Sequence, residues 1–388
     1  MKYISDLLLT NHGSRKEIYT FALCCVMVLG LSSCSINISQ PPPPQLSEVT
    51  PSAAIGDELD SATPAAETTT IPITWAGLNL TGKLAYISSK QDDDLIAKIQ
   101  VLNLATGETK TIFTSPNKGW IYYLTISPDA KDLVMSYIPA SQNNSTFPRI
   151  LYIMPLDGSS PPRPLFSPPS PDDRYIQAEW SPDGKYIYYV QYNSIDKPDA
   201  WLNPPYHLFR MAFPDGQPEK IAELAFWPRV SSDSTKLVYI SIDPESGRND
   251  LYVANADGSN SQLVALSGSG IPEILDAPIF SSDGQTILFS APLPNQSSDR
   301  NWFEKLVGIR VARAHDVPSD WWSVPITGGV PTQLTNIQTI NLFASISPDG
   351  RHIASVSGDG LFVMDVGGSS LTQLISDPGI HGTVSWIP

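Results

Sequence analysis

The stretch Trp180-Ser181-Pro182-Asp183-Gly184 ends one apolar segment and precedes another, and similar stretches recur along the chain. Four further copies are Ile126-Ser127-Pro128-Asp129, Val230-Ser231-Ser232-Asp233, Phe280-Ser281-Ser282-Asp283-Gly284 and Ile346-Ser347-Pro348-Asp349-Gly350. Pro presets φ in a tight turn, Asp bonds to its own turn, and Gly takes the left-handed position. Each copy therefore predicts a turn between two strands, and the regular recurrence predicts a fold built from repeated units.

A sixth unit is divided between two distant parts of the chain. Val384-Ser385-Trp386-Ile387-Pro388 matches the strand before a turn, and Gly82 to Ile87 matches the strand after one. Joining the two halves removes an open sheet edge and closes the repeats into a ring. The sequence therefore predicts an all-β fold: a closed six-bladed β-propeller of four-stranded antiparallel blades, with the first blade completed by the C-terminal strand.

This strand-turn-strand unit resembles the repeat of TolB-type and other WD-like β-propellers from bacterial envelopes. The resemblance covers about residues 75–388. Two copies depart from the motif, because Ser232 and Ser282 stand where other copies have Pro, and Ser234 stands where three copies have Gly. Members of this superfamily serve as scaffolds, as binding modules and as gating domains of peptidases, so the resemblance implies the fold without a single activity.

The first 33 residues have the features of a lipoprotein signal peptide. Lys2, Arg15 and Lys16 precede an apolar run from Ile18 to Leu31. The run ends in Leu31-Ser32-Ser33-Cys34, which resembles a bacterial lipobox, and this resemblance implies that Cys34 becomes the lipidated first residue. A plain secretory signal is the alternative. Residues 34–74, rich in Pro, Ser and Thr, are predicted to form a tether, and residues 75–388 the propeller.

Charge and cysteine content restrict the possible partners and chemistry. The net charge of −15 argues against a nucleic-acid partner, which needs clustered Lys and Arg. The three cysteines are Cys24, Cys25 and Cys34, so cleavage would leave only the lipid-bearing sulfur and no disulfide. We expect an extracytoplasmic protein anchored to a bacterial membrane or cell surface through Cys34.

No residue constellation in the sequence predicts catalysis, a metal site or a cofactor. The nucleophile elbow Gly-x-Ser-x-Gly is missing, and Ser267-Gly268-Ser269-Gly270 has its residues in the wrong order. The histidines after residue 34 fall on separate elements without metal-ligand spacing. The turn aspartates are assigned to their turns, and the run Asp92 to Asp94 to a solvated loop in preference to a Ca²⁺ site. We therefore assign no catalytic residue, metal or cofactor.

Long connections between the second and third strands of the blades should emerge on one face, opposite the Ser-Pro-Asp-Gly turns, and binding is expected there. The longest is an insertion at residues 292–319 in blade five. It either forms a basic amphipathic binding segment or packs as a lid. Trp321 and Trp322 align with Leu151-Tyr152 and its counterparts as a packing pair, although Trp321 is kept as a candidate. The candidate binding residues are Asp199, Trp201, Trp302, Arg310, Arg313, His315 and Trp321.

These features together predict a lipid-anchored, non-catalytic binding or scaffold module for an envelope protein, peptide or glycan. The alternative is a lyase or hydrolase acting on a saccharide at the mouth of the central channel, since scattered polar residues leave no linear motif. Converging carboxylates at that mouth would favour the enzyme. An exposed apolar patch on the insertion would favour partner binding.

Overall fold

The computed structural model describes residues 67–90, 96–116, 119–139, 149–167, 173–193, 206–244, 248–267, 275–293 and 317–388. All of them belong to the compact unit Ile55–Pro388. Strands β1 to β25 account for the regular structure of these residues, together with one short 3-10 helix, η1 (Ala76–Leu78). Within these described ranges, no helix has the length and apolar character needed to cross a membrane.

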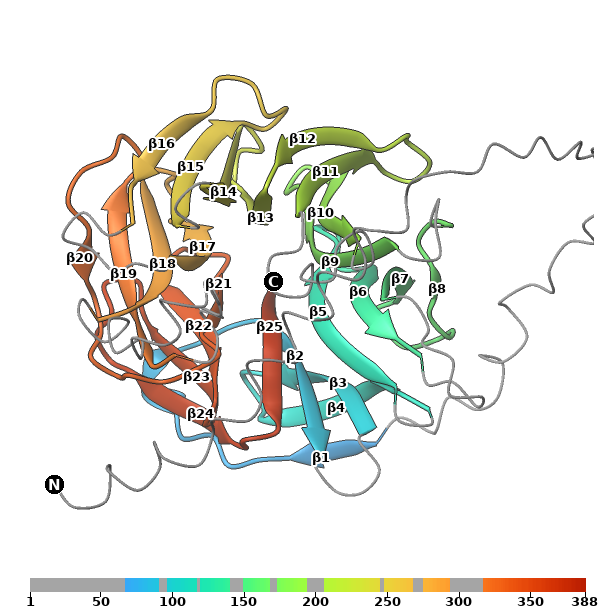
Figure 1. The fold of residues 1–388 in the computed structure, drawn as a ribbon. Helices are drawn as coiled ribbons and strands as arrows, with labels where there is room; N and C mark the ends of the chain where they lie inside the picture. Colours follow the sequence, from blue (N-terminus) through green and yellow to red (C-terminus); the bar gives the residue numbers. More distant parts are fainter. Residues whose placement is uncertain are drawn as a thin grey trace, which may run out of the picture. The chain divides into compact units, whose positions relative to one another are not determined.

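Six antiparallel sheets follow one another as blades around a ring, in sequence order from blue to red (Figure 1). Blade two contains β5 (Trp120–Ile126), β6 (Asp132–Ile138), β7 (Ile150–Pro155) and β8 (Arg163–Pro164). Blade three contains β9 (Asp173–Trp180), β10 (Tyr186–Asn193), β11 (His207–Ala212) and β12 (Glu219–Glu223). Blade four contains β13 (Ala225–Val230), β14 (Lys236–Ile242), β15 (Asn249–Asn255) and β16 (Gln262–Ala265). Blade five contains β17 (Asp276–Phe280), β18 (Thr286–Pro292), β19 (Ser319–Pro325) and β20 (Thr332–Gln333). Blade six contains β21 (Phe343–Ile346), β22 (His352–Ser357), β23 (Gly360–Asp365) and β24 (Thr372–Ser376).

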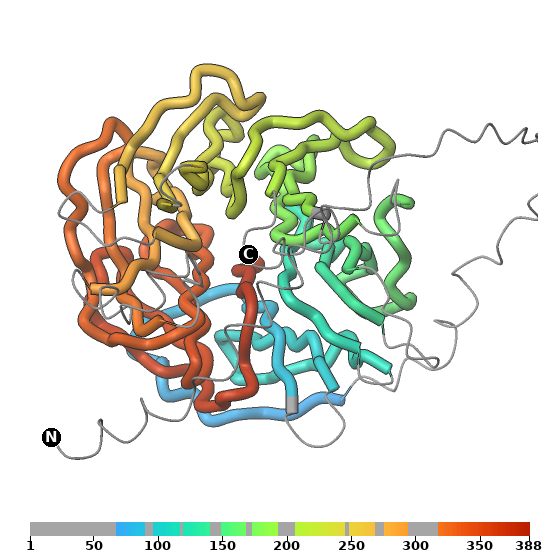
Figure 2. Tube along the Cα trace, in the orientation of Figure 1, coloured from blue at the N-terminus to red at the C-terminus, as the bar shows by residue number. Residues whose placement is uncertain are grey.

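Blade one joins distant parts of the chain, as predicted. Its inner strand is β25 (Ile380–Ile387), which pairs antiparallel with β2 (Lys83–Lys90) so that Trp386 faces Leu84. The blade continues outward through β3 (Ile96–Asn103) and β4 (Glu108–Thr114). In the tube trace, the red C-terminal strand lies beside the blue strands of this blade (Figure 2). The six-bladed ring and its closure by the C-terminal strand are therefore confirmed.

Blade one also carries a strand that the sequence did not predict. β1 (Thr68–Thr70) pairs with β4 as a fifth, outer strand, with Thr69 opposite Thr109. These residues were assigned to the tether, which was expected to extend to residue 74. Threonine is β-branched and favours strands, so three consecutive threonines can occupy an open edge without matching any repeat.

The repeated turns have the predicted conformation. In each of the five, the Ser hydroxyl donates to the Asp carboxylate two residues on, at 2.6–2.8 Å. The same Ser oxygen accepts the backbone N–H five residues on at 2.9–3.0 Å. Gly184, Gly284 and Gly350 follow the Asp with φ of 72°, 67° and 71°. The turn aspartates thus have a structural role.

Trp321 and Trp322 form the pair on the third strand of blade five that the comparison of blades aligned with Leu151-Tyr152. Residues of blades five and six pack around Trp321. Trp321 on β19 is fully buried, and Leu151, Leu251 and Leu361 at the matching places of other blades are also buried. Trp321 packs in a cluster with Leu342 and Met364. The structure therefore places Trp321 in the core, so it cannot contribute to a binding surface in this fold, contrary to its selection as a candidate.

Candidate functional site

The order of strands in the blades defines two ends of the central channel. Each inner strand ends at a Ser-x-Asp turn or, for β25, at Ile387; we call this the turn end. The long connections between second and third strands lie where the inner strands begin, and we call this the loop end. The Ser-x-Asp turns allow the six inner strands to be compared position by position, counting back from the turn Ser or its counterpart Ile387.

Four positions before the turn, large and small side chains alternate around the ring. Blades two, four and six contribute aromatic residues, namely Tyr123, Trp227 and Phe343. Blades three, five and one contribute smaller ones, namely Gln177, Ala277 and Thr383. Alternation of large and small residues lets side chains from six converging strands fill one layer without overlap.

The three aromatic rings meet across the channel, and we call them the aromatic triad. The ring centroids of Tyr123 and Trp227 are 5.3 Å apart, those of Trp227 and Phe343 are 5.2 Å apart, and those of Tyr123 and Phe343 are 6.2 Å apart. Trp227 and Phe343 are buried. Edge-on contacts at these distances are favourable for aromatic pairs. The triad therefore occupies the channel between its two ends.

The smaller residues of this layer bond to the neighbouring blade. The backbone N–H of Trp227 donates to Oε1 of Gln177 at 2.9 Å. The Thr383 hydroxyl accepts the Leu124 N–H and donates to the Leu124 carbonyl, both at 2.7 Å. Gln177 thus ties blade three to blade four, and Thr383 ties blade one to blade two. The layer holds adjacent inner strands together as well as filling the channel.

Beyond the triad, a hollow of about 390 Å³ opens at the turn end. Its inner ring contains the residues two before the turn: Thr125, Glu179, Arg229, Ile279, Ser345 and Ser385. Its exposed rim contains the residues one after it: Pro128, Pro182, Ser232, Ser282, Pro348 and Pro388. All six blades therefore contribute to one pocket, whose volume lies in the range of ligand sites, roughly 300–1,000 Å³.

One ion pair supplies the charge of the inner ring. Arg229 Nη1 lies 3.0 Å from Glu179 Oε2. Burial raises the pKa of Glu179, while the Arg229 charge and the Thr125 hydroxyl act in the opposite direction. These residues form a polar chain across blades two, three and four. Ile279, Ser345 and Ser385 line the other half, so the hollow offers hydroxyl and apolar contacts beside an internally neutralised pair.

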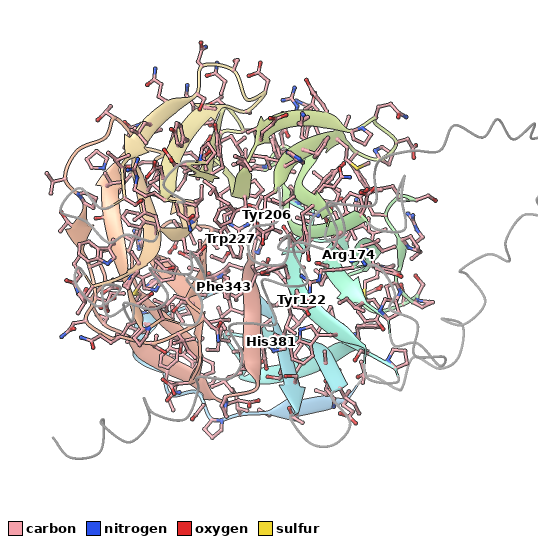
Figure 3. The ribbon with its side chains drawn as sticks, in the orientation of Figure 1. Tyr122, Arg174, Tyr206, Trp227, Phe343 and His381 are labelled. Atoms are coloured by element: carbon pink, nitrogen blue, oxygen red, sulfur yellow. The ribbon has the colours of Figure 1, made fainter. Side chains whose placement is uncertain are left out.

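At the loop end, Trp120, Tyr122 and His381 form a second cluster, and Tyr122 and His381 are labelled in Figure 3. The rings of Trp120 and His381 stack with centroids 4.6 Å apart. Trp120 also meets Tyr122 edge-on at 6.1 Å. All three side chains are half-buried, so the cluster is a partly exposed aromatic surface made by blades one and two.

The other candidate residues from the sequence, Asp199, Trp201, Trp302, Arg310, Arg313 and His315, lie outside the described residues. In blade five, β18 ends at Pro292 and β19 begins at Ser319, so the connection spans residues 293–318. Cys34 and the run Asp92 to Asp94 also lie outside the described ranges. Among the residues that are described, no group of His, Cys, Asp or Glu could hold a metal ion.

Sequence reasoning missed the channel layers and the loop-end cluster. The signal for the layers was present, because counting back from each turn Ser reveals the series Tyr123, Gln177, Trp227, Ala277 and Phe343. This series becomes visible only when the residues before each turn are aligned with one another, whereas the turn motif alone gives the number of blades. The loop-end cluster had no such signal, since Trp120 and His381 stand at different positions along their inner strands.

Comparisons with known proteins identify the fold. No protein-family model matches the chain, and no curated protein matches its sequence. TolB from Acinetobacter baumannii has a similar structure, with a TM-score of 0.57 and 17% identity over 79% of this chain and 67% of that one. A TolB-type protein from Agrobacterium tumefaciens gives 0.52 and 16% over 80% of this chain and 99% of that one. A chain of a nidogen/laminin complex gives 0.52 and 10% over 79% and 99%. The chain therefore has the six-bladed β-propeller fold that is also found in TolB.

Proposed function

We propose that this protein is a non-catalytic binding module of the bacterial envelope, which takes a segment of an envelope protein, peptide or glycan into the turn-end hollow. The observation that carries the proposal is the hollow itself, to which all six blades contribute. Its hydroxyl groups and prolines can contact a ligand. The charges of Glu179 and Arg229 neutralise each other, so the ligand need not be charged. Structural similarity to TolB supports a binding or scaffold propeller.

The hollow is less suited to the alternative, a saccharide-directed lyase or hydrolase. Hydrolysis of a glycosidic bond usually employs two carboxylates that flank the bond. Among the described residues that line the hollow, Glu179 has the single side-chain carboxylate, and Arg229 already pairs with it. Within the hollow, the raised pKa of Glu179 is a feature in favour of an enzyme. An activity against acidic or neutral oligosaccharides that is lost in Glu179→Gln would support that alternative.

Filling the hollow tests the binding proposal. Ser385 lies in the inner ring, so Ser385→Trp should block the pocket, whereas Ser160→Trp places the same bulk on an exposed hairpin. Immobilised parent protein and both variants would be exposed to detergent-solubilised envelope extract. We expect Ser160→Trp to retain every captured component and Ser385→Trp to lose at least about tenfold, a difference of about 1.4 kcal/mol. Full capture by a folded Ser385→Trp variant would place binding elsewhere.

The lipid anchor belongs to the same proposal and is tested separately. If Cys34 is lipidated, Cys34→Ala should move the protein from the detergent phase to the aqueous phase. Cys24→Ala, which alters a cysteine within the proposed signal, should partition like the parent. Unchanged partitioning of Cys34→Ala would contradict the anchor and leave the binding proposal standing.

A further inference from the structure

Arg149 occupies an unusual environment at the loop end. It immediately precedes β7, and its backbone is fixed by a hydrogen bond from the Tyr175 N–H to its carbonyl at 2.8 Å. Its guanidinium carbon lies 3.5 Å from the centroid of the Tyr122 ring on β5. Stacking of a guanidinium on an aromatic face is favourable and holds the planar group in one orientation.

The guanidinium of Arg149 makes no ion pair and donates no hydrogen bond to any described residue. Its Nε is buried without a hydrogen-bond partner. Arg210 and Arg229, which are also half-buried, pair with Glu219 and Glu179 at 2.8 and 3.0 Å. A charged donor withdrawn from water without a partner is costly. No described residue supplies an anion to Arg149, so its guanidinium is free to bind one from a ligand.

The Tyr123 hydroxyl lies within electrostatic reach of the same guanidinium. Tyr123 is enclosed, and burial raises the pKa of its hydroxyl, while the charge of Arg149 acts in the opposite direction. Tyr206 and Tyr192 of blade three, whose ring centroids lie 5.4 Å apart, also raise the pKa of the Tyr123 hydroxyl. Asp276 of blade five acts on it too, but this side chain is buried and has an interaction of its own.

The neighbouring aromatic groups are held in place. Both ring nitrogens of His381 face backbone carbonyls, those of Gly379 at 3.0 Å and Ile121 at 3.1 Å. The His381 ring supports Trp120, which in turn meets Tyr122. A rigid group of Trp, Tyr and Arg side chains is the composition found at energetic centres of protein–protein interfaces.

We propose that Arg149, stacked on Tyr122, binds a carboxylate of an acidic peptide segment at the loop end of the channel. The guanidinium presents its terminal nitrogens to the carboxylate, and the aromatic group around it contacts the peptide. The net charge of −15 opposes non-specific adsorption of an acidic chain, so binding has to depend on this local group. The site lies at the opposite end from the hollow and stands independently of the function proposed for it.

The test uses the full chain and two peptides of equal length, acetyl-(Glu)4-amide and acetyl-(Gln)4-amide, with binding followed by tryptophan fluorescence and calorimetry. We expect the Glu peptide to bind the parent and the Gln peptide to bind at least about tenfold more weakly. Arg149→Gln should lose the preference for the Glu peptide, and Arg149→Lys should retain part of it, because a lysine keeps the charge and loses the fork geometry. Arg163→Gln removes an exposed arginine on β8 and should bind like the parent.

Two results would overturn the proposal. One is equal binding of the Glu and Gln peptides to the parent, a comparison that does not depend on whether any variant folds. The other is Arg149-dependent binding of an oligogalacturonate probe without binding of the Glu peptide, which would make the ligand an acidic saccharide. Full capture by folded Ser385→Trp together with Arg149-dependent binding of the Glu peptide would reject the hollow and leave the Arg149 site standing, so the two failures are distinguishable.

Discussion

A single residue position in the repeated turn reveals how closely the blades follow one design. Gly184, Gly284 and Gly350 follow the turn Asp, whereas Ala130 stands there in blade two and Ser234 in blade four. Ala130 nevertheless has φ of 55° and Ser234 of 61°. The turn therefore imposes the left-handed conformation on residues that disfavour it, at a cost of roughly 1–2 kcal/mol each.

We predict that Ala130→Gly raises the free energy of unfolding by up to about 1 kcal/mol, because relief at positive φ exceeds the extra entropy of an unfolded glycine. Gly184→Ala should lower it by about 1 kcal/mol for the same reason. Nothing lies closer than 4.0 Å to a Cβ at Gly184, so the backbone, not a clash, would cause the loss. Urea unfolding of both variants provides the measurement.

Gly367 is the matched control, because a Cβ there meets nothing within 4 Å and its φ is not in the left-handed region. Gly367→Ala should be neutral or slightly stabilising. Equal stability of Gly184→Ala and Gly367→Ala would mean that the turn does not select glycine. The turn was predictable from sequence because all its determinants lie within a few residues of one another.

Among the elements, β25 has the most consequences for the ring. Its Val384, Trp386 and Ile387 are buried. The Trp386 N–H donates to Ser345 Oγ of blade six at 3.0 Å, its Nε1 donates to the Thr81 carbonyl at 3.0 Å, and Thr383 binds Leu124 of blade two. One strand thus contacts three blades. Burial of its three large side chains contributes about 1.5–3 kcal/mol each, which approaches the whole stability of an average domain.

Deletion of Thr383 to Pro388 should therefore abolish the cooperative unfolding transition, measured by circular dichroism during heating. Deletion of Pro388 alone removes an exposed residue after the strand and should leave the transition in place. A longer deletion that melts like the parent would contradict closure of the ring by this strand.

The number of blades and their closure could be predicted because repeated elements reinforce one another along the sequence. β1 could not, since its three threonines match no repeat and are held by the edge of β4. Trp321 was misjudged because a tryptophan in place of leucine suggested a surface role, while the space beside Leu342 was large enough to enclose it. The hollow at the turn end was also not anticipated, because short regular turns suggested a featureless face.

Across the whole molecule, the aspartates of the five turns make the free energy of unfolding depend on pH in the acid range. Lys131, and then the Ser127 hydroxyl, lower the pKa of Asp129 to about 2. The turn Ser hydroxyl is the first cause of a lowered pKa at Asp183, Asp233, Asp283 and Asp349. A carboxyl with a lowered pKa stabilises the fold above its ordinary pKa, and this contribution is lost as the pH falls through the lowered value. Glu179, with a raised pKa, has the opposite sign: its contribution is lost as the pH rises through the raised value.

We predict that the melting temperature falls steeply between about pH 4 and about pH 2, the interval between the ordinary aspartate pKa and the value for Asp129. Scanning calorimetry at half-unit steps would measure it. The double variant Ser181→Ala, Ser281→Ala should melt lower at pH 6 and change less between pH 4 and pH 2, because the hydroxyls that lower the pKa are gone. A flat profile in the parent would contradict this origin of acid sensitivity.

Closure through β25 also decides the order in which the molecule can be assembled. During synthesis β2 is made before blades two to six. Its inner partner, β25, is the last of the described strands to be made. Leu84 and Tyr86, buried in the finished ring, must wait without that partner until the remaining blades exist. A waiting strand edge of this kind is open to pairing with other chains. Blade one is begun first and completed last, so the edge of β2 is the place where an incomplete chain is open to wrong pairing.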